Sequence, residues 1–94
     1  MRGLREDAET VALKALTWLA GHETLLDVFM GSTGAGLDDL RAGAQDPDFL
    51  ASVLDFILMD DAWVISFCDT EGIPYDHLMQ ARAALPGGQQ VHWT

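Results

Sequence analysis

The stretch DPDFLASVLDFILM, residues 46–59, decides the fold more clearly than any other part of the chain. Asp46 suits the capping position of a helix, because its carboxylate can accept from free backbone amides, and Pro47 suits the first helical position. The residues that follow are apolar on nearly every side, with Ser52 and Asp55 as the polar strip. This pattern predicts a central, mostly buried helix.

Outside this stretch the spacing of apolar residues is also helical, and no run shows the alternation of a strand. Gly34 and Gly72 suit the left-handed residue that closes a helix, and Asp60 suits a cap. The predicted further helices cover residues 5–20, 23–33, 37–44, 60–71 and 74 or 75 to 85. We therefore expect an all-α protein, a compact globule of five or six helices, depending on whether 37–44 is helical.

A weak repeat with an offset of 38 positions links the two halves of the chain. It places Phe29 on Phe67 and Gly34 on Gly72, and it also pairs several leucines and helix-starting acids. The first three predicted helices would then correspond to the last three, as two pseudo-repeated units. Either duplication or the chance likeness of helical sequences accounts for it. Two units are too few for a solenoid, so we expect a globule.

Length and composition predict one small packed domain. The chain has 94 residues, of which 49% are hydrophobic, which is too apolar for disorder and too short for a second core. Pro86-Gly87-Gly88 stops the last helix. We expect a single helical domain over residues 1–88 and a flexible tail over residues 89–94.

The charge is strongly negative and unevenly placed. The formal net charge is −10, and residues 42–81 contain eight acids with no lysine or arginine. Such a surface repels phosphate backbones and anionic lipid, so we expect neither nucleic acid nor membrane as a partner. The apolar run 49–68 is interrupted by three aspartates, so it does not predict a membrane span. One cysteine and no recognisable signal peptide favour a cytoplasmic location.

The polar residues predict no active site, cofactor site or metal site. Asp38-Asp39 and Asp60-Asp61 fall at predicted helix starts, where aspartate favours capping. The three histidines lack metal-binding spacing, and Cys68 lies on an apolar helix face as a buried structural cysteine would. The loop 31–36 lacks the lysine and the preceding strand of a phosphate-binding loop. We therefore expect a protein that is not an enzyme.

A surplus of apolar side chains on the two helices after residue 46 is the remaining signal. Phe56, Trp63, Val64 and Ile65 cannot all point to one centre. Either neighbouring helices cover them, or they form an exposed surface for a protein partner or a second copy. The second interpretation predicts a small interaction or regulatory protein. The alternatives are a binder of a small apolar ligand and a helix-turn-helix DNA binder, although the acidic charge disfavours DNA.

Three runs of the sequence carry a family resemblance: residues 15–20 (ALTWLA), 46–56 (DPDFLASVLDF) and 81–88 (ARAALPGG). Together they resemble a small family of uncharacterised bacterial proteins, a domain-of-unknown-function family chiefly from alphaproteobacteria. The resemblance covers residues 7–88 and implies a compact, all-helical cytoplasmic protein. It supplies no reaction, ligand or catalytic residue. Ile73-Pro74-Tyr75 stands where such a chain is expected to have an Asp or Ser cap, which leaves the start of the last helix open.

Overall fold

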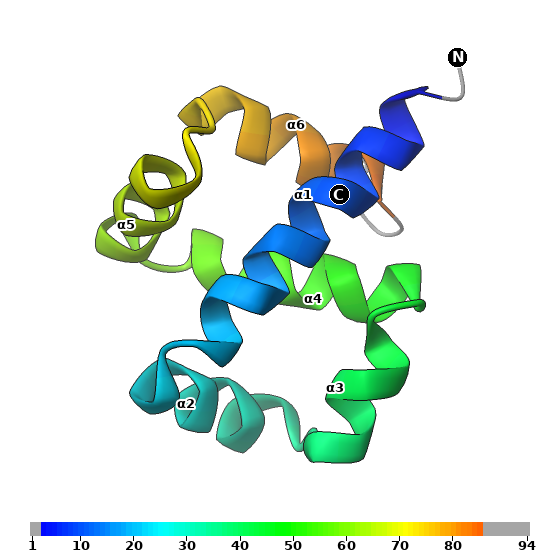
Figure 1. Cartoon of the computed structure of the whole chain (residues 1–94), viewed down its shortest axis with the longest axis vertical. Helices are drawn as coiled ribbons and strands as arrows, with labels where there is room; N and C mark the ends of the chain where they lie inside the picture. The colour runs from blue at the N-terminus through cyan, green and yellow to red at the C-terminus, as the bar shows by residue number, and fades with distance from the viewer. Residues whose placement is uncertain (1–2, 86–94) are drawn as a thin grey trace, which may run out of the picture.

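A computed structural model describes residues 3–85 of the chain as six α-helices without a strand (Figure 1). The helices are α1 (Gly3–Ala20), α2 (Glu23–Thr33), α3 (Leu37–Gly43), α4 (Pro47–Leu58), α5 (Asp61–Glu71) and α6 (Tyr75–Ala84). The predicted all-α class is confirmed, and the helix expected over 37–44 is formed as α3. The tail predicted for residues 89–94 lies outside the described residues.

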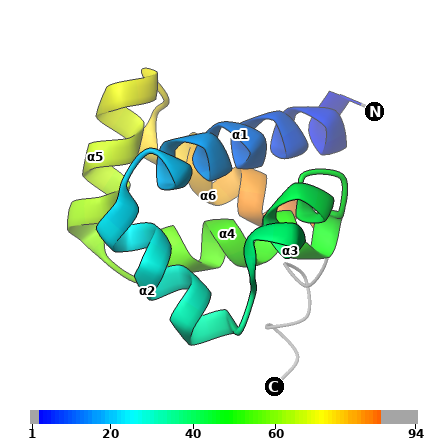
Figure 2. The same cartoon turned by 60° about the horizontal axis from the view of Figure 1, so that its bottom comes forward.

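Helix α4 is the central helix that the sequence predicts. Its start is fixed by Asp46, whose Oδ1 accepts from the Asp48 backbone amide at 3.0 Å, and by Pro47 at the first helical position. Six of its twelve residues are buried. Helix α1 packs across both α4 and α6 (Figures 1 and 2). Only Asp48 and Asp55 of α4 are exposed, because neighbouring helices cover much of the rest of its surface.

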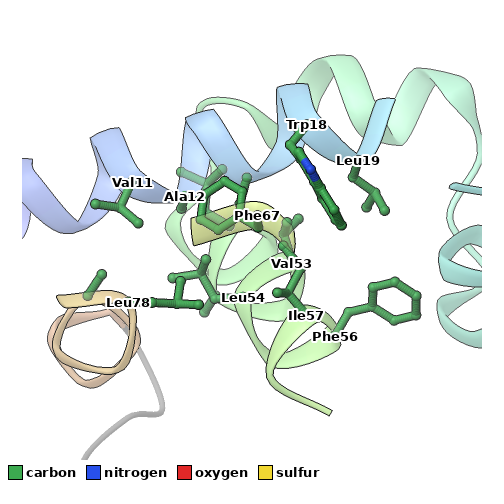
Figure 3. Packing of buried hydrophobic residues seen from close by; sticks show 14 of the residues in the cluster. Val11, Ala12, Trp18, Leu19, Val53, Leu54, Phe56, Ile57, Phe67 and Leu78 are labelled. Atoms are coloured by element: carbon green, nitrogen blue, oxygen red, sulfur yellow. The ribbon is translucent and has the colours of Figure 1, made fainter. Parts of the chain in front are cut away.

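The core lies between α1 and α4 and is closed by α5 and α6 (Figure 3). Leu19 of α1, Leu54 and Ile57 of α4, Phe67 of α5 and Leu78 of α6 are all fully buried. Burying one such side chain stabilises the fold by about 1.5–3 kcal/mol relative to leaving it in water. All four of these helices therefore contribute to one cluster rather than to two separate cores.

The repeat seen in the sequence is present in the local structure. Helices α2 and α5 both have 11 residues, and their starts and ends differ by 38 positions. Gly34 and Gly72 follow them in the left-handed conformation, with φ of 77° and 69°, which glycine adopts without steric cost. Helices α3 and α6 then begin at Leu37 and Tyr75, which differ by the same offset.

The two units pack reciprocally. The third helix of the first unit, α3, packs on α4, and the third helix of the second unit, α6, packs on α1. Helices α1 and α4, the first of each unit, contact each other in the centre of the molecule (Figure 2). Neither unit has a closed core without the other, so the chain is a globule rather than the beginning of a solenoid.

Helix α6 begins at Tyr75 without a side-chain cap. Pro74 occupies the capping position in an extended conformation. The helix is held instead by its buried residues Leu78 and Ala81 and by an ion pair between Arg82 and Asp55 of α4. Among residues 3–85, no helix combines the length and the apolar character that crossing a bilayer requires.

Candidate functional site

The four apolar residues singled out in the sequence divide into two pairs. Phe56 is 4% exposed and stacks on Trp63 with ring centroids 4.7 Å apart and an interplanar angle of 25°. Trp63 is itself half-buried against the core. Of the two alternatives that the sequence leaves open, Phe56 follows the covered one, because Trp63 and the helix α2 residue Phe29 cover its ring.

Val64 and Ile65 lie together in an apolar groove between α4, α5 and α6. The groove has a volume of about 390 Å³. Its lining consists of Leu58 at the end of α4, Asp61, Val64 and Ile65 on α5, and Tyr75 and Met79 on α6. Ile65 is 46% exposed, Tyr75 48% and Met79 62%, so much of this apolar surface faces solvent. We call this set of six residues the α5–α6 groove.

Sequence reasoning missed the half of the groove that α6 supplies. Tyr75 and Met79 are four residues apart and so share one face of α6. That spacing is a usable signal, but it does not reveal which neighbouring helix the face meets. Leu58, in the run that the sequence predicts to be the central helix, is half-buried and lines the groove.

Carboxylates border the apolar floor. Asp61 lines the groove, and the Tyr75 hydroxyl donates to Asp69 Oδ1 across 3.5 Å. Partial burial of the phenol and the neighbouring Asp69 carboxylate together raise the pKa of Tyr75 above its ordinary value. The Tyr75 hydroxyl thus serves as a hydrogen-bond donor at the edge of the groove.

The two units differ at the positions that form this groove. The residues that correspond to Ile65 and Met79 in the first unit are Asp27 and Arg41, although the helices that carry them have the same order and spacing. Both first-unit residues are exposed and charged. The same helical geometry is thus built with charged side chains in one unit and with exposed apolar side chains in the other.

A second hollow lies between the end of α2, α3 and the start of α4, with a volume of about 450 Å³. Its polar groups have local partners. Asp39 Oδ2 accepts from the Gly36 amide at 2.8 Å, Ser52 donates to the Phe49 carbonyl at 2.6 Å, and Thr33 donates to the Phe29 carbonyl at 2.8 Å. These bonds are all made within the helices or the turns that carry the donors, so these three side chains are engaged locally rather than presented to a ligand.

The residues weighed as catalytic or metal-binding candidates have structural positions. Asp60 Oδ1 accepts from the Ala62 amide at 2.8 Å as the cap of α5. Cys68 is 1% exposed, and burial, with a smaller contribution from Asp69, raises the pKa of its thiol, which disfavours the reactive thiolate. Within residues 7–85, no three histidine, cysteine or acidic side chains converge as a metal site. His22 Nδ1 lies 2.7 Å from the Trp18 carbonyl, and His92 is outside the described residues.

Comparison with known proteins gives a family but no function. No curated protein and no solved structure is significantly similar to the chain. A family model described as a protein of unknown function, DUF3572, matches residues 5–88, which span all six helices from the first turns of α1 onward. The chain therefore belongs to the DUF3572 family.

Proposed function

We propose that this protein is a small, non-enzymatic interaction or regulatory protein that binds a segment of a partner protein in the α5–α6 groove. The observation that carries the proposal is an apolar groove of about 390 Å³ whose side chains Ile65, Tyr75 and Met79 are about half exposed or more. Exposed apolar side chains gathered on one hollowed surface mark interaction sites more often than scattered ones do.

The contrast between the two units supports a binding role over incidental exposure. The side chains of Ile65 and Met79 are 46% and 62% exposed to water. The residues at the corresponding positions of the first unit, Asp27 and Arg41, are charged. Charged side chains there are compatible with helices of the same order and spacing. An apolar pair in their place exposes hydrophobic surface to water, and we attribute its presence to a bound partner.

A small apolar ligand is the second candidate, because the groove volume falls within the range of small-molecule sites, about 300–1,000 Å³. Such sites bury roughly 70–90% of their ligand. Both helices that border the α5–α6 groove contribute partly exposed side chains, Ile65 from α5 at 46% and Tyr75 and Met79 from α6 at 48% and 62%. That shape suits one face of a helix better than it suits an enclosed ligand.

Nucleic acid and membrane are not the proposed partners, because residues 42–81, which contain the groove, carry eight acids and no lysine or arginine. We also place the protein in the cytoplasm, since its single cysteine is a buried free thiol. Recovery of the native protein in a membrane fraction or an extracellular fraction would contradict that placement.

Site-specific photo-crosslinking in cells that naturally express the chain tests the proposal. A photoreactive residue at position 65 or 79 should give one discrete crosslinked protein, identified by mass spectrometry. The same residue at position 27 or 41 is the matched control and should not give it. No product at 65 and 79, or the same product at all four positions, would contradict binding in the groove.

A further inference from the structure

One edge of the α5–α6 groove has a regular pattern of charge. Asp61, Ile65 and Asp69 are spaced four residues apart along α5 and therefore lie on one face of the helix. With a rise of 1.5 Å per residue, the two carboxylates are about 12 Å apart along the axis, one turn on either side of Ile65. Asp61 lines the groove, and Asp69 meets the Tyr75 hydroxyl at its other end.

The chain offers these carboxylates no cation of its own from the surrounding segment. No lysine or arginine occurs between Ala42 and Ala81. Arg82, the next basic residue, is bound to Asp55 by two hydrogen bonds, from Nε at 2.5 Å and from Nη2 at 3.1 Å. The groove therefore combines an apolar floor with a negative edge that a partner can neutralise.

We propose that the segment bound in the groove is a basic amphipathic helix. Its apolar side chains contact Ile65 and Met79, and lysine or arginine side chains about two helical turns apart face Asp61 and Asp69. This inference rests on the proposed function and specifies its partner. An amphipathic helix in an apolar groove is an established recognition mode, and charge complementarity at the edge gives it orientation and rate of association.

The other two occupants fit this edge less well. A second copy of the chain would bring another molecule of net charge −10 against the same carboxylates, and like charges at an interface oppose association. The C-terminal segment of the chain itself, residues 86–94, contains no lysine or arginine. Neither supplies the cations that the spacing of Asp61 and Asp69 calls for.

Two synthetic helical peptides test the inference against the full-length protein. They share one leucine stripe, and one has lysines and the other glutamates on the two flanks. Fluorescence anisotropy at low and at physiological salt measures the two affinities. The lysine peptide should bind at least about tenfold more tightly, and added salt should weaken its binding because the rim charges are exposed.

Two double variants separate the charge from the apolar floor. Asp61→Asn with Asp69→Asn should weaken the lysine peptide about three- to tenfold and flatten its salt dependence. The matched control, Glu23→Gln with Asp27→Asn on α2, removes the same charge away from the groove and should leave the affinity unchanged. Ile65→Asp with Met79→Arg should abolish binding of both peptides.

The outcomes distinguish this inference from the proposed function. Equal binding of both peptides, lost in the Ile65→Asp, Met79→Arg variant, keeps the groove as the site and overturns the basic partner. Crosslinking at positions 65 and 79 to a protein without a basic amphipathic helix does the same. Peptide binding that survives the Ile65→Asp, Met79→Arg variant overturns both. Self-association that this variant abolishes assigns the groove to a second copy and overturns the inference.

Discussion

The ring of Phe29 on α2 packs edge-on against the ring of Phe56 on α4, with centroids 5.3 Å apart and planes at 73°. Exchanging each residue for its counterpart in the other unit converts this pair into Phe67 and Trp18, which also pack edge-on, at 5.8 Å and 71°. Each unit thus places an aromatic of its second helix against the first helix of the other unit. Such an exchange of equivalent contacts is the pattern of a two-fold interface, here within one chain.

Trp18 is buried with an unsatisfied hydrogen-bond donor. It is 6% exposed, and its Nε1 donor has no acceptor among the described residues. A buried donor without a partner costs about 1–3 kcal/mol, and phenylalanine, the residue at the corresponding position 56, has no such donor. We expect Trp18→Phe to change the free energy of unfolding by less than about 1 kcal/mol, because removing the donor offsets the lost volume.

Trp18→Ala provides the comparison, since it removes the ring together with the donor and should cost about 3–5 kcal/mol. Urea unfolding followed by circular dichroism measures both variants without relying on tryptophan fluorescence. If Trp18→Phe were as costly as Trp18→Ala, the unpaired donor would not be a defect of the site.

Gly43 of α3 lies against the Phe49 ring of α4. A Cβ atom at this position would overlap Cγ, Cδ2 and Cε2 of Phe49, and the Phe49 ring packs edge-on against Phe29 at 5.8 Å. Gly43→Ala should therefore destabilise the protein by about 1–3 kcal/mol, as overpacking does. Chemical denaturation measures the loss, and Gly43→Ala combined with Phe49→Leu should recover part of it.

Gly31 supplies the control, because it lies in α2 and a Cβ there meets nothing within 4 Å. Gly31→Ala should leave stability unchanged or raise it by up to about 1 kcal/mol through helix propensity. Equal effects of the two alanine substitutions would mean that the α3–α4 contact is not tightly packed.

The sequence predicts helix ends better than it predicts the surface. Asp46, Asp60, Gly34 and Gly72 act within one turn of the chain, so their roles as caps and as helix closures can be inferred locally, and the structure places them there. The groove is different, because α5 and α6 contribute to it jointly. No periodicity along α5 shows that Ile65 has Met79 as its neighbour.

Phe56 shows the same limit in the opposite direction. Its helix has more apolar residues than one direction of burial can cover, which made an exposed position for Phe56 plausible. The ring is covered by Phe29 from the first unit and by Trp63 from the second. Burial here depends on the packing between units, which is a property of the assembled fold and not of the helix.

Arg82 and Asp55 join α6 to α4 by a bidentate ion pair in which the arginine side chain is 18% exposed and the aspartate 56%. Because one partner is partly buried and the geometry is bidentate, we expect a coupling energy of about 1 kcal/mol, at the upper end of exposed pairs. A double-mutant cycle of Asp55→Asn and Arg82→Met measures it by urea unfolding. Its value should fall when salt is raised, and a coupling near zero at low salt would contradict a role in holding α6.

Cys68 links stability to alkaline pH. Burial, with Asp69 second, raises the pKa of its thiol in the folded state above the ordinary 9.0, whereas the unfolded chain has the ordinary value. The unfolded state therefore loses the proton first, so this contribution to stability is fully present below about pH 9 and is lost as pH rises through the folded pKa. We compare the free energy of unfolding at about pH 8 and about pH 10.5, on either side of the ordinary thiol pKa. The wild type should lose more stability over this range than Cys68→Ala does.

Thiol labelling gives an independent readout of the same site. The native protein should react with a thiol reagent only as fast as it opens, and urea should release rapid labelling. Parallel pH profiles for wild type and Cys68→Ala, together with fast labelling of the native state, would show that the thiol is neither buried nor a source of the alkaline transition.

Replacing two apolar side chains of the groove by the residues at the corresponding positions of the first unit tests whether the protein folds without them. Ile65→Asp with Met79→Arg installs the residue types found at the corresponding positions of the first unit, on helices of the same order and spacing. Ile65 is 46% exposed and Met79 62%, so neither side chain is fully buried, and the introduced carboxylate and guanidinium would present opposite charges across the groove. We expect the free energy of unfolding to change by less than about 1 kcal/mol and helicity to be retained.

Thermal and urea unfolding by circular dichroism check this expectation. A loss of several kcal/mol would show that Ile65 and Met79 belong to the core and that the groove is a by-product of packing. Retained stability combined with lost binding of the helical peptides would instead assign these two side chains to binding alone.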